Sequence, residues 1–560
     1  MLRAQAVKVS LGATFFTALL IRSIPGLSTG VPYNYDSWEA LGIVSFTLKA
    51  GYLPYIPPHG PNFYSMTILL SALLGVSEVD VFAYAMPLIS SSSVLFTFLL
   101  ARRLTGDSAA AVYSSLFAAV MGVFVHQTGI SVPEALGLTY ASLALPLLYD
   151  VMFSGGVSKT LLLLMSCGAI LLTHHLTTFF TLLGLVILSV LVLAGLRRFE
   201  PRLLAPVVLT TVAALIVVGW WFLGIPGTTI LFFRLIFETT ARMPVLSFAL
   251  ASAVVLYFVL IVFQWNRVAR PPFDMNMRGL ILRGGILSGT AFVIVLYLIE
   301  FLVPTVSTYQ LGPDYVLFYV VPYLVCVLFP VILGLYFLFD RCRDSFRRAF
   351  AVVWCAAPIT SSFFLLAASQ WLLIGYRSLA FLLLGGFPLV GLGLAELVKA
   401  QNVRWRLTQG YAIAYICLLL AYTAFPPPSL LFGHNEAYSR SEVSAAYWAG
   451  EFFDRRVVVD SDHRMGVLLR YTTMQRVVLG NETSWLGNVS QAGSVGDVQP
   501  TLGYIVVTDS MLVYAVTGDW TTMPKPLPRE AVMYLDGSPS LNRVFSSTTV
   551  TIYRNLRGAW

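Results

Sequence analysis

The segment Val31-Pro-Tyr-Asn-Tyr-Asp-Ser-Trp-Glu-Ala40 follows directly after the first apolar run of the chain and continues to Gly51-Tyr-Leu-Pro-Tyr55. It holds two carboxylates, Asp36 and Glu39, and several aromatic residues in a chain that is poor in charge. An acid held just outside a membrane helix can bind a metal or a polar head group, or it can be a solvated loop residue. The rest of the sequence is needed to choose between these interpretations.

Composition places the chain in a membrane. Of its 560 residues, 57% are hydrophobic and 11% are charged, whereas soluble domains carry about 25% charged residues. Apolar runs recur from Val9 to Phe425, and at about 20 residues each is long enough to cross a hydrocarbon core of about 30 Å. Arg3 and Lys8 precede the first run, which we interpret as a retained signal anchor. The sequence therefore predicts a polytopic α-helical membrane protein.

Thirteen transmembrane spans are predicted, at residues 8–28, 81–101, 108–125, 134–152, 159–173, 176–196, 203–224, 243–264, 283–303, 315–339, 350–374, 378–397 and 404–425. A further apolar stretch at 61–76 is of marginal length, so we expect a helix that lies on or dips into the outer surface.

The distribution of basic residues sets the orientation. Four lie in the outer loops of the membrane part, namely Lys49, Arg234, Arg242 and Arg377. With the N-terminus inside, the inner loops hold nineteen: Arg3, Lys8, Arg102, Arg103, Lys159, Arg197, Arg198, Arg202, Arg267, Arg270, Arg278, Arg283, Arg341, Arg343, Arg347, Arg348, Lys399, Arg404 and Arg406. The positive-inside rule predicts a multi-pass cell-membrane protein with a cytoplasmic N-terminus and an extracytoplasmic C-terminus. Topology thus accounts for the basic pI, and we expect no nucleic acid partner.

The chain divides into two domains. We expect a transmembrane domain at 1–428, with a first outer loop at 29–80, and a small extracytoplasmic α/β domain at 429–560. In the second domain the spacing predicts a helix over 441–454 with Ser441 as its cap, and short strands at 456–460, 504–508 and 544–553.

The outer loops gather acidic residues. Glu134 follows Pro133 in a short loop at the start of the fourth span, where an acid can simply complement the helix dipole. The functional alternative is that Glu134 faces Asp36 across the outer mouth and that the two acids hold one divalent cation. Carboxylate oxygens are the ligands that Mg²⁺ or Mn²⁺ prefers.

Two histidines, His174 and His175, occupy the tight outer turn between the fifth and sixth spans. Imidazoles can ligate metals, transfer protons or bind phosphate, and a satisfied interfacial histidine is the alternative. Adjacent residues on a helix point about 100° apart, so we do not expect both to bind one ion.

Arginines supply the outer positive charge. Arg377 begins the twelfth span in Gly375-Tyr-Arg-Ser-Leu-Ala380. It can snorkel to the interface or hold a lipid phosphate with its planar fork. Arg234 is a second-rank candidate for the same role. No Gly-x-x-x-x-Gly-Lys, Gly-x-Gly-x-x-Gly after a strand, His-Glu-x-x-His or Cys-x-x-Cys motif is present, so we expect no nucleotide cofactor and a substrate that arrives through the membrane.

The order of these parts resembles the C-type (GT-C) superfamily of polytopic glycosyltransferases that use lipid-linked donors, especially the oligosaccharyltransferase catalytic-subunit branch. Tyr35-Asp-Ser-Trp-Glu39 is similar to that branch's first-loop acidic motif, Ser131-Val-Pro-Glu134 to its second-loop motif, and Tyr376-Arg377 to its pyrophosphate-binding arginine. The branch's Trp-Trp-Asp motif, which reads the acceptor sequon, is missing. The resemblance therefore implies sugar transfer from a lipid-linked donor and leaves the acceptor (protein, lipid or glycan) open.

The leading hypothesis is a glycosyltransferase that uses a polyprenyl (dolichyl-type) phosphate or diphosphate sugar. Asp36 would act as general base or metal ligand and Glu134 as second ligand, while Glu39, Arg377, Arg234, His174 and His175 would bind substrate. A transporter or flippase of a lipid-linked or anionic solute is the rival. A non-catalytic assembly scaffold is the third possibility.

Overall fold

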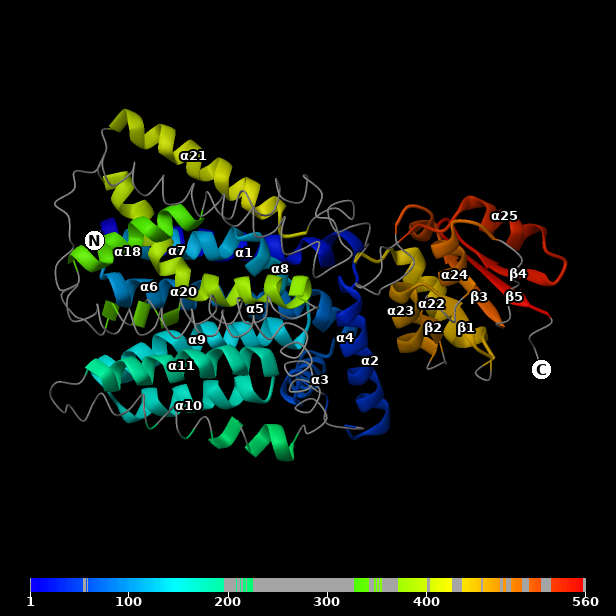
Figure 1. The fold of residues 1–560 in the computed structure, drawn as a ribbon, viewed down its shortest axis with the longest axis horizontal. Coiled ribbons are helices and arrows are strands. Elements are labelled where there is room, and N and C mark those ends of the chain that lie inside the picture. Colours follow the sequence, from blue (N-terminus) through cyan, green and yellow to red (C-terminus); the bar gives the residue numbers. More distant parts are fainter. Residues whose placement is uncertain are drawn as a thin grey trace, which may run out of the picture.

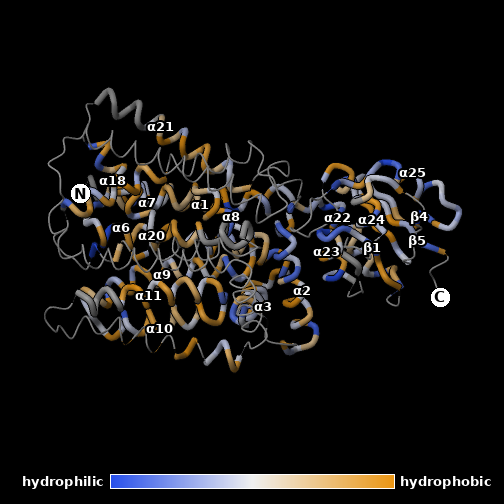
Figure 2. Tube along the Cα trace, viewed as in Figure 1, coloured by the Kyte–Doolittle hydropathy of each residue, from blue (hydrophilic) through white to orange (hydrophobic). Residues whose placement is uncertain are grey.

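The computed structural model describes residues 2–53, 57, 59–195, 327–341, 371–399, 403–425, 436–454, 457–473, 477–479, 485–495, 503–514 and 525–556, and scattered residues within 208–224 and 347–354. A bundle of helices forms one part of the molecule and a small α/β domain the other (Figure 1). Hydrophobic residues predominate along the bundle helices, and polar residues are frequent where the bundle meets the C-terminal domain (Figure 2).

Four described helices are long and apolar enough to cross a membrane. They are α1 (Leu2–Thr29), the segment Glu78–Thr105, α9 (Pro133–Ser154) and α20 (Trp371–Lys399). The segment Glu78–Thr105 combines α4 (Glu78–Asp80), the π-helical turn η1 (Val81–Ala85), α5 (Met86–Ser91) and α6 (Ser93–Thr105). These helices match the predicted first, second, fourth and twelfth spans.

Shorter apolar helices correspond to other predicted spans. They are α10 (Val157–Leu171), α11 (His175–Gly195), α18 (Phe329–Arg341) and α21 (Val403–Tyr422). The predicted spans 243–264 and 283–303 lie outside the described residues, and those at 203–224, 315–339 and 350–374 lie partly outside. The total of thirteen spans therefore stays a prediction.

One predicted boundary is wrong. We expected a break at residues 375–377, but α20 runs without interruption from Trp371, which puts Arg377 inside the helix. A single glycine in a helix costs about 1 kcal/mol relative to alanine and does not end it. Gly375 therefore interrupts neither the backbone hydrogen bonds nor the apolar sequence that begins at Trp371.

The third predicted span is bent. Its two halves, α7 (Ser108–Val120) and α8 (Gly122–Gly129), meet at 62°. Arg22 of α1 is fully buried at this break, where its guanidinium donates to the carbonyls of Ala118 and Ala119 (3.3 and 3.5 Å) and to Thr128 Oγ1 (2.9 Å). A cation satisfies the last carbonyls of a helix and complements its dipole. Arg22 therefore stabilises the broken span.

Glycines allow α20 to pack closely against its neighbours. A Cβ at Gly391 would lie 2.0 Å from Ser114 Oγ and 2.2 Å from the carbonyl oxygen of Ala110, both on α7. On α18, a Cβ at Gly334 would lie 1.9 Å from the carbonyl oxygen of Leu389. Small residues at helix contacts bring backbones together in membrane proteins, where packing drives association.

The N-terminus and the C-terminal domain lie at opposite ends of the bundle (Figure 1). At the N-terminal end, Arg103 Nε is 2.5 Å from Asp150 Oδ1, and Lys399 pairs with Asp107. The first pair joins the C-terminal ends of α6 and α9, and the second joins the C-terminal end of α20 to the N-cap of α7. A membrane crossed by the bundle would separate the N-terminus from the C-terminal domain.

Two helices, α2 (Tyr35–Ala50) and α3 (Asn62–Leu74), lie at the other end and run across the bundle (Figure 1). At 13 residues, α3 is about 20 Å long, too short for a span. Its Leu69, Leu73 and Leu74 are more than half exposed. These features fit the interfacial helix expected at 61–76.

The C-terminal domain has a five-stranded sheet in the order β2-β1-β3-β5-β4. Its strands are β1 (Val459–Ser461), β2 (Val477–Leu479), β3 (Tyr504–Thr508), β4 (Leu541–Ser546) and β5 (Val550–Asn555). β1 is parallel to both β2 and β3, and β5 is antiparallel to both β3 and β4. The α/β class is as expected, whereas the boundary at 428/429 lies outside the described residues.

Two local predictions for this domain are corrected. The strand expected at 544–553 is a hairpin, because residues 547–549 form the turn between β4 and β5. The helix expected at 441–454 is α22 (Arg440–Phe452), and its cap is Ser439 rather than Ser441. Ser439 and Glu442 form a reciprocal capping box, which satisfies two backbone N–H groups at once. The domain also contains α23 (His463–Thr473), α24 (Trp485–Ala492), the 3₁₀-helical turn η5 (Asp509–Leu512) and α25 (Arg529–Gly537).

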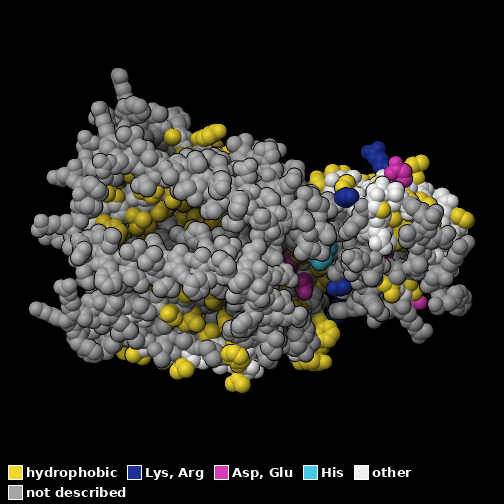
Figure 3. All heavy atoms as spheres, viewed as in Figure 1, with side chains coloured by type: hydrophobic (Ala, Val, Ile, Leu, Met, Phe, Trp, Pro, Cys, Tyr) yellow, Lys and Arg dark blue, Asp and Glu magenta, His cyan; other side chains and the backbone are white. Residues whose placement is uncertain are grey.

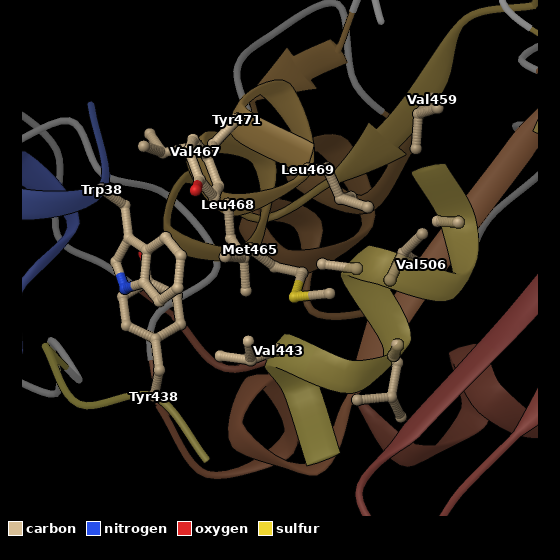
Figure 4. Packing of buried hydrophobic residues seen from close by; sticks show 14 of the residues in the cluster. Trp38, Tyr438, Val443, Val459, Met465, Val467, Leu468, Leu469, Tyr471 and Val506 are labelled. Atoms are coloured by element: carbon tan, nitrogen blue, oxygen red, sulfur yellow. The ribbon is translucent and has the colours of Figure 1, made fainter. Parts of the chain in front are cut away.

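An aromatic cluster joins the two parts of the molecule. Trp38 of α2 is fully buried, with its ring centroid 5.7 Å from that of Tyr438 and 5.3 Å from that of Tyr471 on α23 (Figure 4). Its Nε1–H donates to the carbonyl of Pro32 at 3.2 Å. Within the segment expected as the first outer loop, α2 is therefore a helix that packs against the C-terminal domain.

Candidate functional site

Three distant segments meet where the bundle joins the C-terminal domain. The Asn34 N–H donates to the Glu436 carbonyl at 2.9 Å, and His126 Nδ1 lies 2.9 Å from the Ala424 carbonyl. His126 Nε2 is 3.7 Å from Glu436 Oε2, and its ring centroid is 6.3 Å from that of Tyr33. Acidic, basic and histidine side chains are visible along this junction in Figure 3. We call it the outer junction.

The phenol of Tyr33 is a half-buried member of the outer junction. Burial raises its pKa well above the ordinary value, and the charge of Glu436 and a hydrogen bond to that carboxylate raise it further. The phenol is therefore neutral at physiological pH and serves as a hydrogen-bond donor to Glu436.

Asp36 stands in the first turn of α2, two residues after Asn34 of the outer junction. Asn34 is its N-cap, with a positive φ of 74°, and the Asn34 side chain accepts the Asp36 N–H at 2.7 Å. Asparagine tolerates this left-handed region better than most residues do. Asp36 is half-buried, whereas Glu39, one turn later, is exposed. The substrate-binding role expected for Glu39 stays a prediction.

Glu134 stands in the first turn of α9, after Pro133 at the first helical position, and is only 3% exposed. The loop before it is tied to the second span, because the Ser131 hydroxyl donates to the Phe82 carbonyl in the π-helical turn η1. Leu136 belongs to the same continuous hydrophobic cluster as Trp38. Asp36 and Glu134 therefore lie in the first turns of two helices that contribute residues to one hydrophobic cluster at this end of the bundle. Their binding of a shared cation stays a prediction.

The two histidines of the α10–α11 turn are joined by a third, His59, from the segment before α3. One ring nitrogen from each of His59, His174 and His175 lies within 4.8 Å of the others. Our expectation that His174 and His175 diverge assumed that both are helical. That premise is wrong: α11 begins at His175, so His174 lies outside the helix and the two rings are 5.1 Å apart.

The remaining predicted residues are not placed in a site. Arg377 lies in α20, and nothing is described of its side chain. Arg234 lies outside the described residues. Phosphate binding by either arginine stays a prediction.

Sequence reasoning missed His59, Tyr33 and Glu436. His59 lies in Pro57-Pro-His-Gly-Pro61 within the predicted first outer loop, on the same side as His174 and His175. A comparison of all histidines in the predicted outer loops would have identified His59 as a candidate site residue. For Tyr33 and Glu436 the sequence carries no signal, because their contact is tertiary.

The apolar bundle, the helices lying across the end next to the C-terminal domain and that α/β domain make up a fold similar to that of solved archaeal oligosaccharyltransferases. The oligosaccharyltransferase AglB of Archaeoglobus fulgidus, in complex with an inhibitory peptide and a dolichol-phosphate, superposes with a TM-score of 0.56 at 14% identity, over 91% of this chain and 70% of that chain. An Archaeoglobus fulgidus oligosaccharyltransferase in complex with zinc and sulfate gives a TM-score of 0.55 at 14% identity, over 90% of this chain and 68% of that chain.

ArnT of Cupriavidus metallidurans, bound to undecaprenyl phosphate, has a TM-score of 0.40 at 12% identity, over 98% of each chain. No protein-family model matches the sequence, and no curated protein does either. The likeness is therefore one of fold.

Proposed function

We propose that the protein is an integral-membrane glycosyltransferase. It transfers a sugar or oligosaccharide from a polyprenyl phosphate or diphosphate donor to an acceptor on the extracytoplasmic face. The fold supports this proposal, since the similar AglB structure contains a dolichol-phosphate. The observation that carries it is local: Asp36 and the buried Glu134 both open helices at the end of the bundle that adjoins the C-terminal domain.

Asp36 is proposed as the general base. The acceptor oxygen or nitrogen forms a bond to the sugar's anomeric carbon as it loses its proton to the Asp36 carboxylate. The bond from that carbon to the phosphate oxygen breaks, and the lipid phosphate or diphosphate leaves. A positioned base of this kind contributes about 10²- to 10⁴-fold to a rate. Arg377, Arg234, His174 and His175 are proposed to offset the negative charge of the lipid phosphate, and Glu39 to contact the donor or acceptor.

The two acids also suit a hard divalent cation. A carboxylate as buried as that of Glu134, which is 3% exposed, is stable in its ionised form only beside a cation or hydrogen-bond donors. Asp36 and Glu134 would hold Mg²⁺ or Mn²⁺ through carboxylate oxygens. Such an ion, when bound, neutralises charge on the leaving phosphate.

The acceptor is a protein, a lipid or a glycan, and the C-terminal domain is proposed to recognise it or to close the site. This domain packs directly on α2 through Trp38. An acceptor bound to the domain would therefore be linked by direct packing to the helix that carries Asp36. The proposed orientation places the N-terminus in the cytoplasm and the C-terminal domain outside.

A sugar-release assay on reconstituted protein tests the proposal. The donors are dolichyl- and undecaprenyl-phosphate hexoses, the acceptor is a membrane extract, and release of sugar is measured by mass spectrometry. Asp36→Asn and Glu134→Gln should each slow release by about 100-fold or more. Glu530→Gln is the matched control, because Glu530 also lies in the first turn of a helix, α25, but is exposed. Undiminished release by Asp36→Asn would remove it as the base. Movement of the lipid across the vesicle without sugar release would favour the flippase.

A further inference from the structure

We infer that His59, His174 and His175 form a binding site for a divalent transition-metal ion of the Zn²⁺ type. The site differs from the proposed carboxylate site in its residues and in its ligand chemistry. It stands whether or not the protein is a glycosyltransferase.

The distances suit one ion. His59 Nδ1 and His175 Nδ1 are 3.1 Å apart, and all three ligand nitrogens lie within 4.8 Å of one another. Two nitrogens bound at 2.0–2.1 Å to a tetrahedral zinc are about 3.3 Å apart. The His59–His175 pair is close to this spacing, and the His174 nitrogen lies within 4.8 Å of both.

Proton chemistry favours a cation at this position. Two Nδ1 atoms at hydrogen-bond distance can share only one proton, and protonation of both rings would bring like charges together. The ring of His59 stacks on those of His174 and His175, with centroids 5.3 and 5.0 Å apart. An ion bound to the ring nitrogens would remove this competition for one proton, because each neutral imidazole offers it an in-plane lone pair.

The surrounding residues hold the histidines in place. The Asn62 N–H donates to the Leu172 carbonyl at 2.9 Å, and Asn62 Nδ2 donates to Thr173 Oγ1 at 2.8 Å. Gly60 has a φ of +94°, and a Cβ there would lie 2.3 Å from the Leu172 oxygen. Only glycine permits this approach, which brings His59 onto the α10–α11 turn.

His174 is positioned from its other side. It is 2% exposed, and its Nδ1 is 2.9 Å from Thr177 Oγ1. The Thr177 N–H also donates to His174 Nδ1 at 3.3 Å, and the two contacts together fix the orientation of the His174 ring. A Cβ at Gly137, one turn beyond Glu134 on α9, would lie 3.1 Å from His174 Cβ. The histidine site thus lies against the helix that carries Glu134.

The donor atoms select the ion. Imidazole nitrogen suits Zn²⁺, Co²⁺, Ni²⁺ and Cu²⁺, whereas Mg²⁺ and Ca²⁺ prefer oxygen. Three protein ligands leave the fourth tetrahedral position open. The ion would also join the segment before α3 to the α10–α11 turn.

Metal binding by the full-length protein tests the inference. The protein is purified in detergent with an affinity tag that lacks histidine, stripped with a chelator, and titrated with Zn²⁺ by calorimetry and with Co²⁺ by visible absorption. We expect one equivalent of Zn²⁺ and the absorption of a tetrahedral Co²⁺ complex. His59→Gln and His175→Gln should each weaken binding by on the order of 100-fold or more, and Thr177→Val by about 10- to 100-fold.

The matched control is His463→Gln, which removes a histidine of the C-terminal domain and should bind as the wild type does. Each variant is accepted only if it elutes as a single peak and unfolds at the wild-type temperature in chelator. Wild-type protein that binds no zinc, or histidine variants that bind it normally, would overturn the inference. So would loss of zinc binding in Asp36→Asn and Glu134→Gln with binding intact in the histidine variants. Zinc binding without sugar transfer would instead count only against the proposed function.

Discussion

The indole ring of Trp38 lies edge-to-face against the phenol ring of Tyr471, with their centroids 5.3 Å apart and their planes at 60°. Trp38 belongs to α2, the helix that carries Asp36 in its first turn, and Tyr471 belongs to the C-terminal domain. Aromatic pairs in this geometry contribute about 0.5–1.5 kcal/mol beyond their buried area. The helix that carries the proposed base is therefore held by the C-terminal domain as well as by the bundle.

Trp38→Ala should separate the C-terminal domain from the bundle. Removing a fully buried tryptophan costs about 3–5 kcal/mol, and here it also exposes Tyr438 and Tyr471. We expect a lower unfolding temperature and faster protease cleavage between the two parts, measured on protein in detergent. Tyr52→Ala is the control, because Tyr52 follows the same helix but is 63% exposed. Equal cleavage rates in the two variants would show that Trp38 does not hold the domain.

Gly391→Ala should disrupt the packing of α20 against α7. The added methyl group would lie 2.0 Å from Ser114 Oγ and 2.2 Å from the Ala110 oxygen, and overpacking of this kind costs about 1–3 kcal/mol. The expected result is a lower unfolding temperature and a smaller monodisperse yield. Gly168→Ala on α10 meets nothing within 4 Å and should be neutral or slightly stabilising, because alanine favours helix. A wild-type melting temperature for Gly391→Ala would contradict this close contact.

Asp462→Asn should change how stability depends on pH. Burial raises the pKa of the Asp462 carboxyl to about 6, against the opposing charge of Arg464 and together with that of Glu442; its ordinary value is near 4. Between these values the folded chain binds more protons than the unfolded chain. The contribution of Asp462 to the free energy of unfolding therefore falls by about 3 kcal/mol as pH rises from about 4 to about 6.

Asparagine carries no such dependence and still accepts the Met465 N–H, which Asp462 Oδ1 now receives at 2.6 Å. The melting temperature of Asp462→Asn minus that of the wild type should rise from pH 4 to about pH 6.5 and then level off. Asp509→Asn, at an exposed acid of the same domain, is the control. A flat difference for Asp462→Asn would mean that its carboxyl titrates alike in folded and unfolded chains.

Local sequence features predicted much of the fold. The strand expected at 504–508 is β3, and the apolar runs at 8–28 and 134–152 are α1 and α9. The errors arose where local signals are weak. The single Gly375 does not interrupt α20, and the turn within 544–553 lacks glycine and proline. A β-branched run therefore passed for one strand instead of a hairpin.

For the candidate site, the residue types were predictable and their grouping was not. The segment that begins at Val31 pointed to Asp36, and the short second loop pointed to Glu134, because acids stand out in an apolar sequence. The partners of Arg22 could not be foreseen, because they are backbone carbonyls exposed by a bend between α7 and α8.

Hydrophobic composition and helix-length apolar runs were enough to establish a polytopic membrane protein with an α/β domain at its C-terminus, since burial of apolar surface depends on composition and periodicity. Only the tertiary structure placed Trp38 against Tyr471 and brought His59 to His175, 116 residues along the chain. Such contacts depend on the close approach of separate backbones, as at Gly60, where the absence of a side chain lets one loop lie on another.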